Sequence, residues 1–171
     1  MIRRATPDDL DALLGIEHRA FSLDRFSRRG MRHLLTRGHA TTFVDVEQPG
    51  GRIIGYITLL YRRGSRAAHI YSIAVDPLGT GQRHGTGRGL LQAAEQDAIE
   101  HGCNRMRLEV RCDNAASLAF FTRAGYSETS RYDAYYEDGM QAVMFARDLP
   151  TAVAASAATT AAPPAAAAIV G

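Results

Sequence analysis

The sequence predicts a single α/β domain, an α+β arrangement in which a central mixed, mostly antiparallel sheet is flanked by helices. The chain has 171 residues, the size of one ordinary domain with one hydrophobic core. Its apolar residues change along the chain from helical spacing to the alternation of a strand and back. A strand, helix, strand succession in the middle requires a locally parallel pair, because such a crossover returns the chain in the same direction. Helices are therefore expected on both faces of the sheet.

The amino-terminal half predicts one strand, two helices and a three-stranded meander. A short apolar strand begins at Ile2, and residues 6–9 (TPDD) then combine an N-cap, a proline at the first helical position and two first-turn acids. The helix that follows carries apolar residues at helical spacing as far as Glu17. A second helical piece contains Phe26 and ends before Gly38. Strands are expected at residues 41–46, 53–60 and 68–75.

The carboxyl-terminal half alternates helices and strands. A glycine-rich segment, residues 77–89 (PLGTGQRHGTGRG), leads into a helix that carries apolar residues on one face from Leu90 onward. Residues 105–111 alternate apolar and charged side chains, which is typical of a strand with one buried face. Asp113 and Asn114 are expected to cap a short helix. Two final strands are expected at residues 127–132 and 142–149.

Composition and charge exclude several classes of function. The chain has 20 basic and 18 acidic residues, so its net charge of +2 predicts no nucleic-acid partner. Every basic residue is arginine, which excludes Schiff-base lysine chemistry and the GxxxxGK[ST] phosphate loop. Cys103 and Cys112 match no zinc or disulfide spacing, and the six histidines match no metal-site spacing. No metal is therefore expected.

The two ends of the chain indicate location and domain organisation. The first residues become acidic and amphipathic, and the longest apolar run is far shorter than the roughly 20 residues of a membrane span. We therefore expect a cytoplasmic protein without membrane contact. Residues 150–171 hold 11 alanines and no charge, which predicts a disordered Ala/Thr/Pro-rich tail after a domain at residues 1–149. A docking peptide or translational read-through is the alternative interpretation of this tail.

The glycine-rich segment predicts a phosphate-binding site. Free backbone N–H groups ahead of a helix form a cradle for phosphate oxygens at the positive end of the helix dipole. The dinucleotide-binding pattern GxGxxG fails, because His84 and Leu90 stand where the third glycine belongs in the two possible registers. Residues 82–87 (QRHGTG) instead fit the pattern Q-x-x-G-x-G. A merely flexible loop is the alternative, but it leaves unexplained why the glycines stop where an amphipathic helix starts.

Residues 72–91 resemble the acetyl-CoA pyrophosphate loop of the GNAT acetyltransferases, with SIAVDP before the Q-x-x-G-x-G motif and RGLL after it. The resemblance continues in LEVR at residues 108–111 and in NAASLAFFTRAGY at residues 114–126. The closing RYDAYYEDG at residues 131–139 is similar to the C-terminal hairpin of the RimI-like branch, the protein N-terminal acetyltransferases. This resemblance covers residues 2–149. It implies the GNAT fold, acetyl-CoA as co-substrate and acetyl transfer to an amine.

The resemblance also assigns residues to the co-substrate. It implies that backbone groups of one strand bind the pantetheine arm and the acetyl carbonyl, at Ile73, Ala74 and Val75. Polarisation of a carbonyl by backbone N–H groups is the chemistry of an oxyanion hole. Backbone amides and two arginines would bind the pyrophosphate, at Arg83, His84, Gly85, Thr86, Gly87 and Arg88. Asn114 would hydrogen-bond the pantetheine arm.

Two positions carry the implied proton transfers. The resemblance places the general base at Glu109, which would take a proton from the attacking ammonium group. From the residues alone, Glu109 is equally a surface carboxylate that balances Arg107 and Arg111. The tyrosine that usually protonates the departing thiolate corresponds to Phe121, whose phenyl ring donates no proton. Four tyrosines are candidates for that role: Tyr126, Tyr132, Tyr135 and Tyr136.

The acceptor that the resemblance favours is the α-amino group of a protein or peptide. A small amine, such as an amino acid, a polyamine or an aminoglycoside, is the alternative within the same fold. A catalytically weak acyl-CoA-binding module is a third hypothesis, which Phe121 keeps open. Residues 25–39 carry five arginines and two histidines without one acid, so they form either a solvated helix face or a docking site for an acidic substrate.

Overall fold

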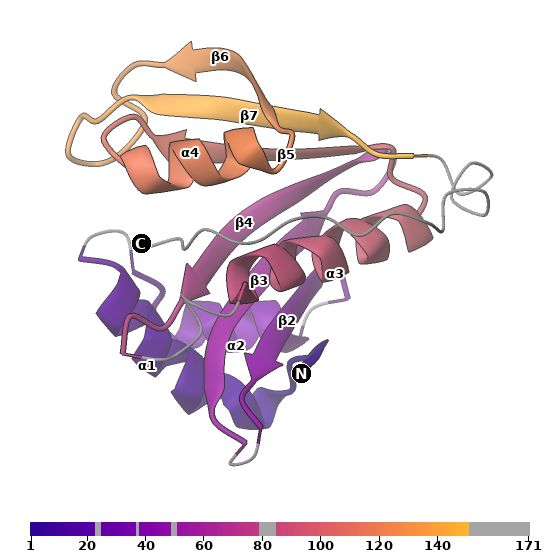
Figure 1. Ribbon diagram of the computed structural model, residues 1–171, viewed down its shortest axis with the longest axis vertical. Helices are drawn as coiled ribbons and strands as arrows, with labels where there is room; N and C mark the ends of the chain where they lie inside the picture. Colours follow the sequence, from indigo (N-terminus) through magenta and orange to yellow (C-terminus); the bar gives the residue numbers. More distant parts are fainter. Residues whose placement is uncertain (23–24, 37, 49–50, 79–84, 151–171) are drawn as a thin grey trace.

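The computed structural model describes residues 1–22, 25–36, 38–48, 51–78 and 85–150. The predicted fold class and the predicted order of elements are confirmed (Figure 1). The segment expected to form the tail lies outside the described residues, apart from Pro150. In chain order the elements are β1 (Ile2–Arg4), the 3-10 turn η1 (Pro7–Asp9), α1 (Leu10–Ala20), α2 (Arg28–Thr36), β2 (Ala40–Val46), β3 (Ile53–Tyr61), β4 (Ala67–Val75), α3 (Thr86–Glu100), β5 (Arg105–Arg111), α4 (Ala115–Arg123), β6 (Ser127–Tyr132) and β7 (Ala142–Asp148).

The described strands form one sheet in the order β1-β2-β3-β4-β5-β7-β6. All neighbours in it are antiparallel except β4 and β5, which are parallel because α3 connects them as a crossover. The β4–β5 register covers only residues 67–69 against 105–107. Beyond these residues the two strands diverge, and the sheet opens into a V (Figure 1).

Helices cover both faces of the sheet and create two cores. On one face, α3 and α4 pack on a cluster that includes Leu90, Met106 and Phe121. On the other face, α1 and α2 bury a second cluster that includes Leu13, Met31 and Tyr56. Strand β5 shows why the sequence folds this way: its buried apolar residues alternate with charged residues that point to the opposite face. Glu109 therefore lies on the face that α1 and α2 cover.

A β-bulge in β4 re-aims the side chains next to the V. Thr58 pairs with Ser72 and Leu59 with Ile70, so Tyr71 is the extra residue in the ladder. Bulges bend a strand and increase its twist, and they recur beside functional sites. Here the bulge follows directly after the last β4–β5 pair, which involves His69. The bulge therefore accompanies the divergence of β4 from β5.

Helix α3 begins earlier than the glycine-rich segment suggested. The sequence predicts a loop through Gly89 before the apolar face starts at Leu90, yet the helix starts at Thr86. Gly85 is the N-cap in a left-handed conformation with φ +73°, which glycine adopts without strain. A Cβ atom on Gly55 of β3 would lie 2.8 Å from the Thr86 methyl group. Glycine at position 55 thus allows the first turn of α3 to lie directly on the sheet.

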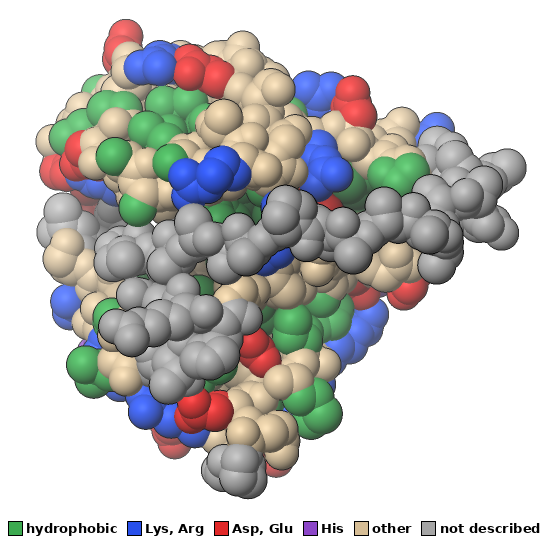
Figure 2. Space-filling model, viewed as in Figure 1, with side chains coloured by type: hydrophobic (Ala, Val, Ile, Leu, Met, Phe, Trp, Pro, Cys, Tyr) green, Lys and Arg blue, Asp and Glu red, His purple; other side chains and the backbone are tan. Residues whose placement is uncertain are grey.

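The surface carries charges of both signs. Acidic and basic side chains are interspersed over the face shown in Figure 2, as the small net charge leads one to expect. Among the described residues, no helix is long and apolar enough to cross a membrane.

Asp76, which directly follows β4, fixes the start of the glycine-rich segment. Its side chain is fully buried, accepts hydrogen bonds from Arg19 and Arg52, and also accepts one from the Leu78 amide. Burial alone would raise the pKa of Asp76, but the two arginines and the amide outweigh it and lower that pKa to about 2. Because the folded pKa lies below the unfolded one, this contribution to stability is complete above pH 4 and is lost as pH falls toward 2.

We expect Asp76→Asn to lower the free energy of unfolding at pH 7 by about 2 kcal/mol, the equivalent of the pKa difference. Denaturant unfolding between pH 3 and pH 7 measures this. The difference in the free energy of unfolding between wild type and variant should narrow at the acidic end. Asp148→Asn is the matched control, because Asp148 is exposed and its one ion pair within the described chain is a surface pair with Arg105. A gap that stays constant with pH would show that the two arginines do not stabilise the charged form.

Candidate active site

The V between β4 and β5 contains a cleft of about 820 Å³. Its walls come from the two diverging strands, from the first turn of α4, from α1 and the residues after it, and from residues 135–137 between β6 and β7. The edge of β4 that faces the cleft has no strand partner beyond His69 within the described part of the chain. Backbone N–H and C=O groups of β4 are therefore available to a ligand in the cleft.

Glu109 and His69 meet on the cleft wall. The His69 Nε2 atom lies 2.5 Å from Glu109 Oε2, across the parallel pair of strands. The side chains are 24% and 15% exposed, so both are accessible from the cleft. Arg111, which the sequence offered as a balancing charge, instead pairs with Asp113 and Asp138. Glu109 thus lies beside an imidazole, in a position to exchange a proton.

Aromatic side chains line one mouth of the cleft. Phe26, which precedes α2, contacts Tyr71 of the bulge with ring centroids 5.2 Å apart. On the opposite wall Tyr135 contacts Tyr136, and the Arg111 guanidinium lies over the Tyr136 ring. Burial raises the pKa of Tyr135, and the charge of Glu109 adds to this effect. The mouth is therefore formed by the segments before α2 and before β7.

A buried hydrogen-bond network holds the Phe26 side of the cleft mouth in place. Glu17 of α1 is 1% exposed and accepts hydrogen bonds from the Tyr56 hydroxyl and from the Phe26 amide, the latter at 3.1 Å. The Tyr56 hydroxyl also lies 2.9 Å from Ser72 Oγ on β4. Burial raises the pKa of Glu17, against the hydrogen bonds that lower it. The network ties α1, β3, β4 and the segment before α2 together.

Phe121, at the position to which the resemblance assigns a tyrosine acid, is a core side chain. Phe121 of α4 is 2% exposed and packs edge-on against Phe120 and Tyr126 at the inner wall of the cleft. The Tyr126 hydroxyl donates to Glu95 at 2.9 Å, and burial raises its pKa. Tyr126 and Tyr132 do not line the cleft, whereas Tyr135 and Tyr136 do.

Asn114 lies at the N-terminus of α4, where the sequence placed a cap. Its side-chain oxygen accepts a hydrogen bond from the Ser117 amide at 3.0 Å. This bond leaves the side-chain NH₂ group of Asn114 as a donor at the cleft.

Residues 9–126 match the acetyltransferase (GNAT) family model. The chain belongs to the GNAT family of acetyltransferases. It is 31% identical over 156 residues to an uncharacterised N-acetyltransferase of Methanocaldococcus jannaschii, covering 89% of this chain and 94% of that protein. It is 31% identical over 140 residues to a mycothiol acetyltransferase of Jonesia denitrificans, covering 76% of this chain and 44% of that enzyme.

The structure of this GNAT acetyltransferase is also similar to the crystal structure of the ribosomal-protein-S18-alanine N-acetyltransferase from Escherichia coli. The TM-score is 0.77 and the identity 27%, covering 89% of this chain and 95% of that one. A sequence alignment with the same E. coli enzyme gives 38% identity over 69 residues, 40% of this chain and 45% of that protein. These similarities confirm the family and the RimI-like resemblance.

The residues implied for the co-substrate are only partly brought together in the described GNAT domain. Ile73 and Asn114 line the cleft, as does Glu109, the residue implied as general base. Ala74 and Val75 follow on β4, and Val75 pairs with Gly55, over which the first turn of α3 lies. Gly85, Thr86, Gly87 and Arg88 form that turn, whereas Arg83 and His84 lie outside the described residues.

Two residues of the candidate site were missed by sequence reasoning. His69 was not singled out, because its pairing with Glu109 depends on the β4–β5 register over a separation of 40 residues. Glu17 was predicted only to lie at the helical spacing of the first helix. An acid at a core position of an amphipathic helix is unusual, and this could have marked Glu17 as a functional candidate. Both residues line the cleft.

Proposed function

We propose that this enzyme transfers the acetyl group of acetyl-CoA to the α-amino group at the N-terminus of a protein or peptide. The observation that carries the proposal is the cleft mouth between Phe26 and Tyr135, at whose base Glu109 is accessible. The similarity over 89% of this chain to an enzyme named for a ribosomal-protein alanine also supports this acceptor.

The residues on the cleft fit acetyl-CoA. The free edge of β4 after His69 offers backbone N–H and C=O groups to a pantetheine arm. The side-chain NH₂ group of Asn114 offers a further hydrogen-bond donor. The first turn of α3 offers backbone amides to a pyrophosphate, with the Arg88 side chain exposed beside them. The buried Thr86 hydroxyl in that turn has no hydrogen-bond partner among the described residues. Bound acetyl-CoA supplies an acetyl thioester, whose carbonyl carbon is the electrophile.

Proton transfer falls to Glu109 and its neighbours. Oε2 of Glu109 is bonded to His69, and Oε1 is the oxygen that accepts a proton from the acceptor's ammonium group. His69 orients the carboxylate through its contact with Oε2. Tyr135 holds its own proton at neutral pH, because burial and the Glu109 charge raise its pKa. We assign to Tyr135 the proton that the departing thiolate needs, in place of Phe121.

We expect Arg88→Gln to weaken acetyl-CoA binding about tenfold while the fold stays intact, because Arg88 is exposed and its loss removes a charge-assisted contact to phosphate. Isothermal titration calorimetry measures the affinity, and raising the salt concentration should shrink the difference. Arg123→Gln is the matched control, an exposed arginine in the last turn of α4. Equal affinities of the two variants for acetyl-CoA would contradict a phosphate contact by Arg88 in the first turn of α3.

We also propose that residues 1–149 carry the activity and that the Ala/Thr/Pro-rich tail does not contribute. A chain that ends after Thr151 is expected to keep its melting temperature and its acetyl-CoA affinity, since an uncharged stretch of small residues buries too little surface to offset its ordering entropy. Thermal unfolding and calorimetry check this. A large fall in melting temperature would show that the tail packs on the domain.

The acceptor class is tested by thiol release from acetyl-CoA. We expect rapid release with peptides that have a free N-terminus, and background release with the same peptides after N-terminal blocking. A small amine acceptor is the second candidate, because the Jonesia denitrificans relative is named for mycothiol. Release with amino acids, polyamines or aminoglycosides but not with peptides would favour that candidate. Binding of acetyl-CoA without release for any amine would indicate a binding module.

A further inference from the structure

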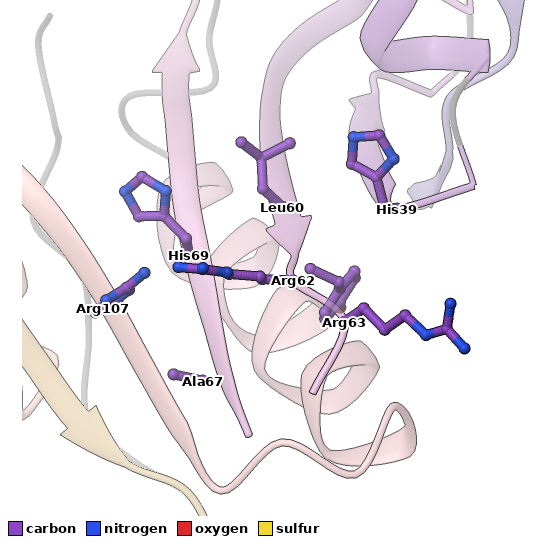
Figure 3. Close-up of a pocket in the computed structure, with 8 residues that line it drawn as sticks. His39, Leu60, Arg62, Arg63, Ala67, His69 and Arg107 are labelled. Carbon is purple, nitrogen blue, oxygen red and sulfur yellow. The ribbon is translucent and has the colours of Figure 1, made fainter. Parts of the chain in front are cut away.

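A second cavity, of about 470 Å³, adjoins the cleft and is lined mainly by basic side chains (Figure 3). It lies between the end of β3 and the starts of β2, β4 and β5. Its walls carry the basic residues His39, Arg62, Arg63, His69 and Arg107, and no acid among the described residues lines it. An anion is therefore the ligand that its chemistry favours.

The arginines of this second cavity differ from most others in the described chain. Arg62, Arg63 and Arg107 have no ion pair or side-chain hydrogen bond with any described residue. By contrast, Arg19 and Arg111 each pair with an acid. Figure 3 shows the Arg62 side chain directed toward His69 and Arg107, whereas Arg63 is directed away from them. Guanidinium groups that lie close together without an acid between them repel each other, so an anionic ligand bound between them is stabilised.

The second cavity adjoins the cleft at His69. His69 lines both cavities and contacts Glu109. Arg107 and Glu109 point to the same face of β5, since they are two residues apart on one strand. Two residues along a strand span about 6.6 Å, which is also the length of two residues in an extended peptide. A peptide whose amine lies at Glu109 and whose chain follows β5 toward the start of that strand thus brings its second or third residue level with Arg107.

We propose that the second cavity selects acceptors with an acidic side chain at the second or third residue, by binding that carboxylate between Arg62 and Arg107. This inference rests on the proposed acetylation of peptide N-termini. It also gives a role to part of the acid-free segment 25–39, because His39 contributes to the cavity wall. The acceptor then lies along the sheet, with its amine at Glu109 and its carboxylate at the arginines.

A peptide series tests this selection by steady-state kinetics. Peptides share one N-terminal residue and carry Asp, Asn or Lys at position two or three. We expect kcat/KM to be at least tenfold higher for the Asp peptide than for the Asn peptide, mainly through KM, and to be lowest for Lys. High salt should reduce the preference, because the contact is ionic.

Variants locate the preference on the two arginines. In Arg62→Gln and Arg107→Gln the Asp peptide should lose its advantage, while kcat/KM for the Asn peptide stays within twofold of wild type. Arg66→Gln, which removes an exposed arginine outside the cavity, should keep the preference. Equal wild-type rates for the Asp and Asn peptides would overturn the role of the cavity and leave N-terminal acetylation standing. If none of the peptides were acetylated, both the acidic preference and the proposed N-terminal acetylation would be overturned.

Discussion

Glu109→Gln is expected to lower kcat by about 10²-fold at pH 7 and to leave acetyl-CoA affinity unchanged, because the amide cannot accept the proton of the acceptor's ammonium group. The loss should shrink as pH rises. An α-amino group has a pKa near 8, so above that pH most of the acceptor is already deprotonated in solution. A lysine ε-amine, with its pKa near 10.4, would keep its dependence on Glu109 over the same range.

Steady-state rates from pH 6 to pH 9 measure this effect, with an acceptor for which chemistry limits turnover. Glu100→Gln is the matched control, an exposed glutamate at the end of α3 whose side chain, among the described residues, hydrogen-bonds only Gln96 on its own helix. It should match wild type throughout. If Glu109→Gln also matched wild type at pH 7, Glu109 would be only a hydrogen-bond partner of His69.

Glu17→Ala is expected to destabilise the protein by about 3 kcal/mol, because it leaves a void and removes the buried acceptor of the Phe26 amide and the Tyr56 hydroxyl. The same change should raise KM for the acceptor, since Phe26 forms one side of the cleft mouth. Denaturant unfolding and steady-state kinetics measure the two effects.

Two further variants separate the causes. Glu17→Gln retains a side-chain oxygen for the Phe26 amide and should lose much less stability than Glu17→Ala. Asp11→Ala removes an exposed carboxylate of the same helix, whose surface ion pair with Arg28 should contribute no more than about 1 kcal/mol. Equal losses for Glu17→Ala and Asp11→Ala would show that the buried network does not stabilise the mouth.

The order of elements was predictable because it depends on local pattern. Alternation along residues 105–111 placed Glu109 on the polar face of a strand, and Asn114 stood where a helix cap belongs; the structure shows both. The family followed from the motif that leads into α3. These features depend on residues that are neighbours in the chain.

The remaining features depend on register and on distant contacts. The contact of His69 with Glu109 requires the parallel pairing of β4 and β5, and the bulge at Tyr71 is not signalled by any glycine or proline nearby. Whether Tyr126 or Tyr135 faces the cleft depends on how α4 and the segment before β7 pack. The arginines of the second cavity come from separate elements, so their convergence could not be predicted from spacing.

The proposed acceptor is tested most directly by locating the acetyl group on a product. A peptide with a free N-terminus and one internal lysine is incubated with the enzyme and acetyl-CoA, and the product is sequenced by tandem mass spectrometry. We expect a single acetyl group on the α-amino nitrogen, formed at a rate that falls in Glu109→Gln. Acetylation of the lysine side chain, or an unmodified peptide alongside acetylated small amines, would contradict the account.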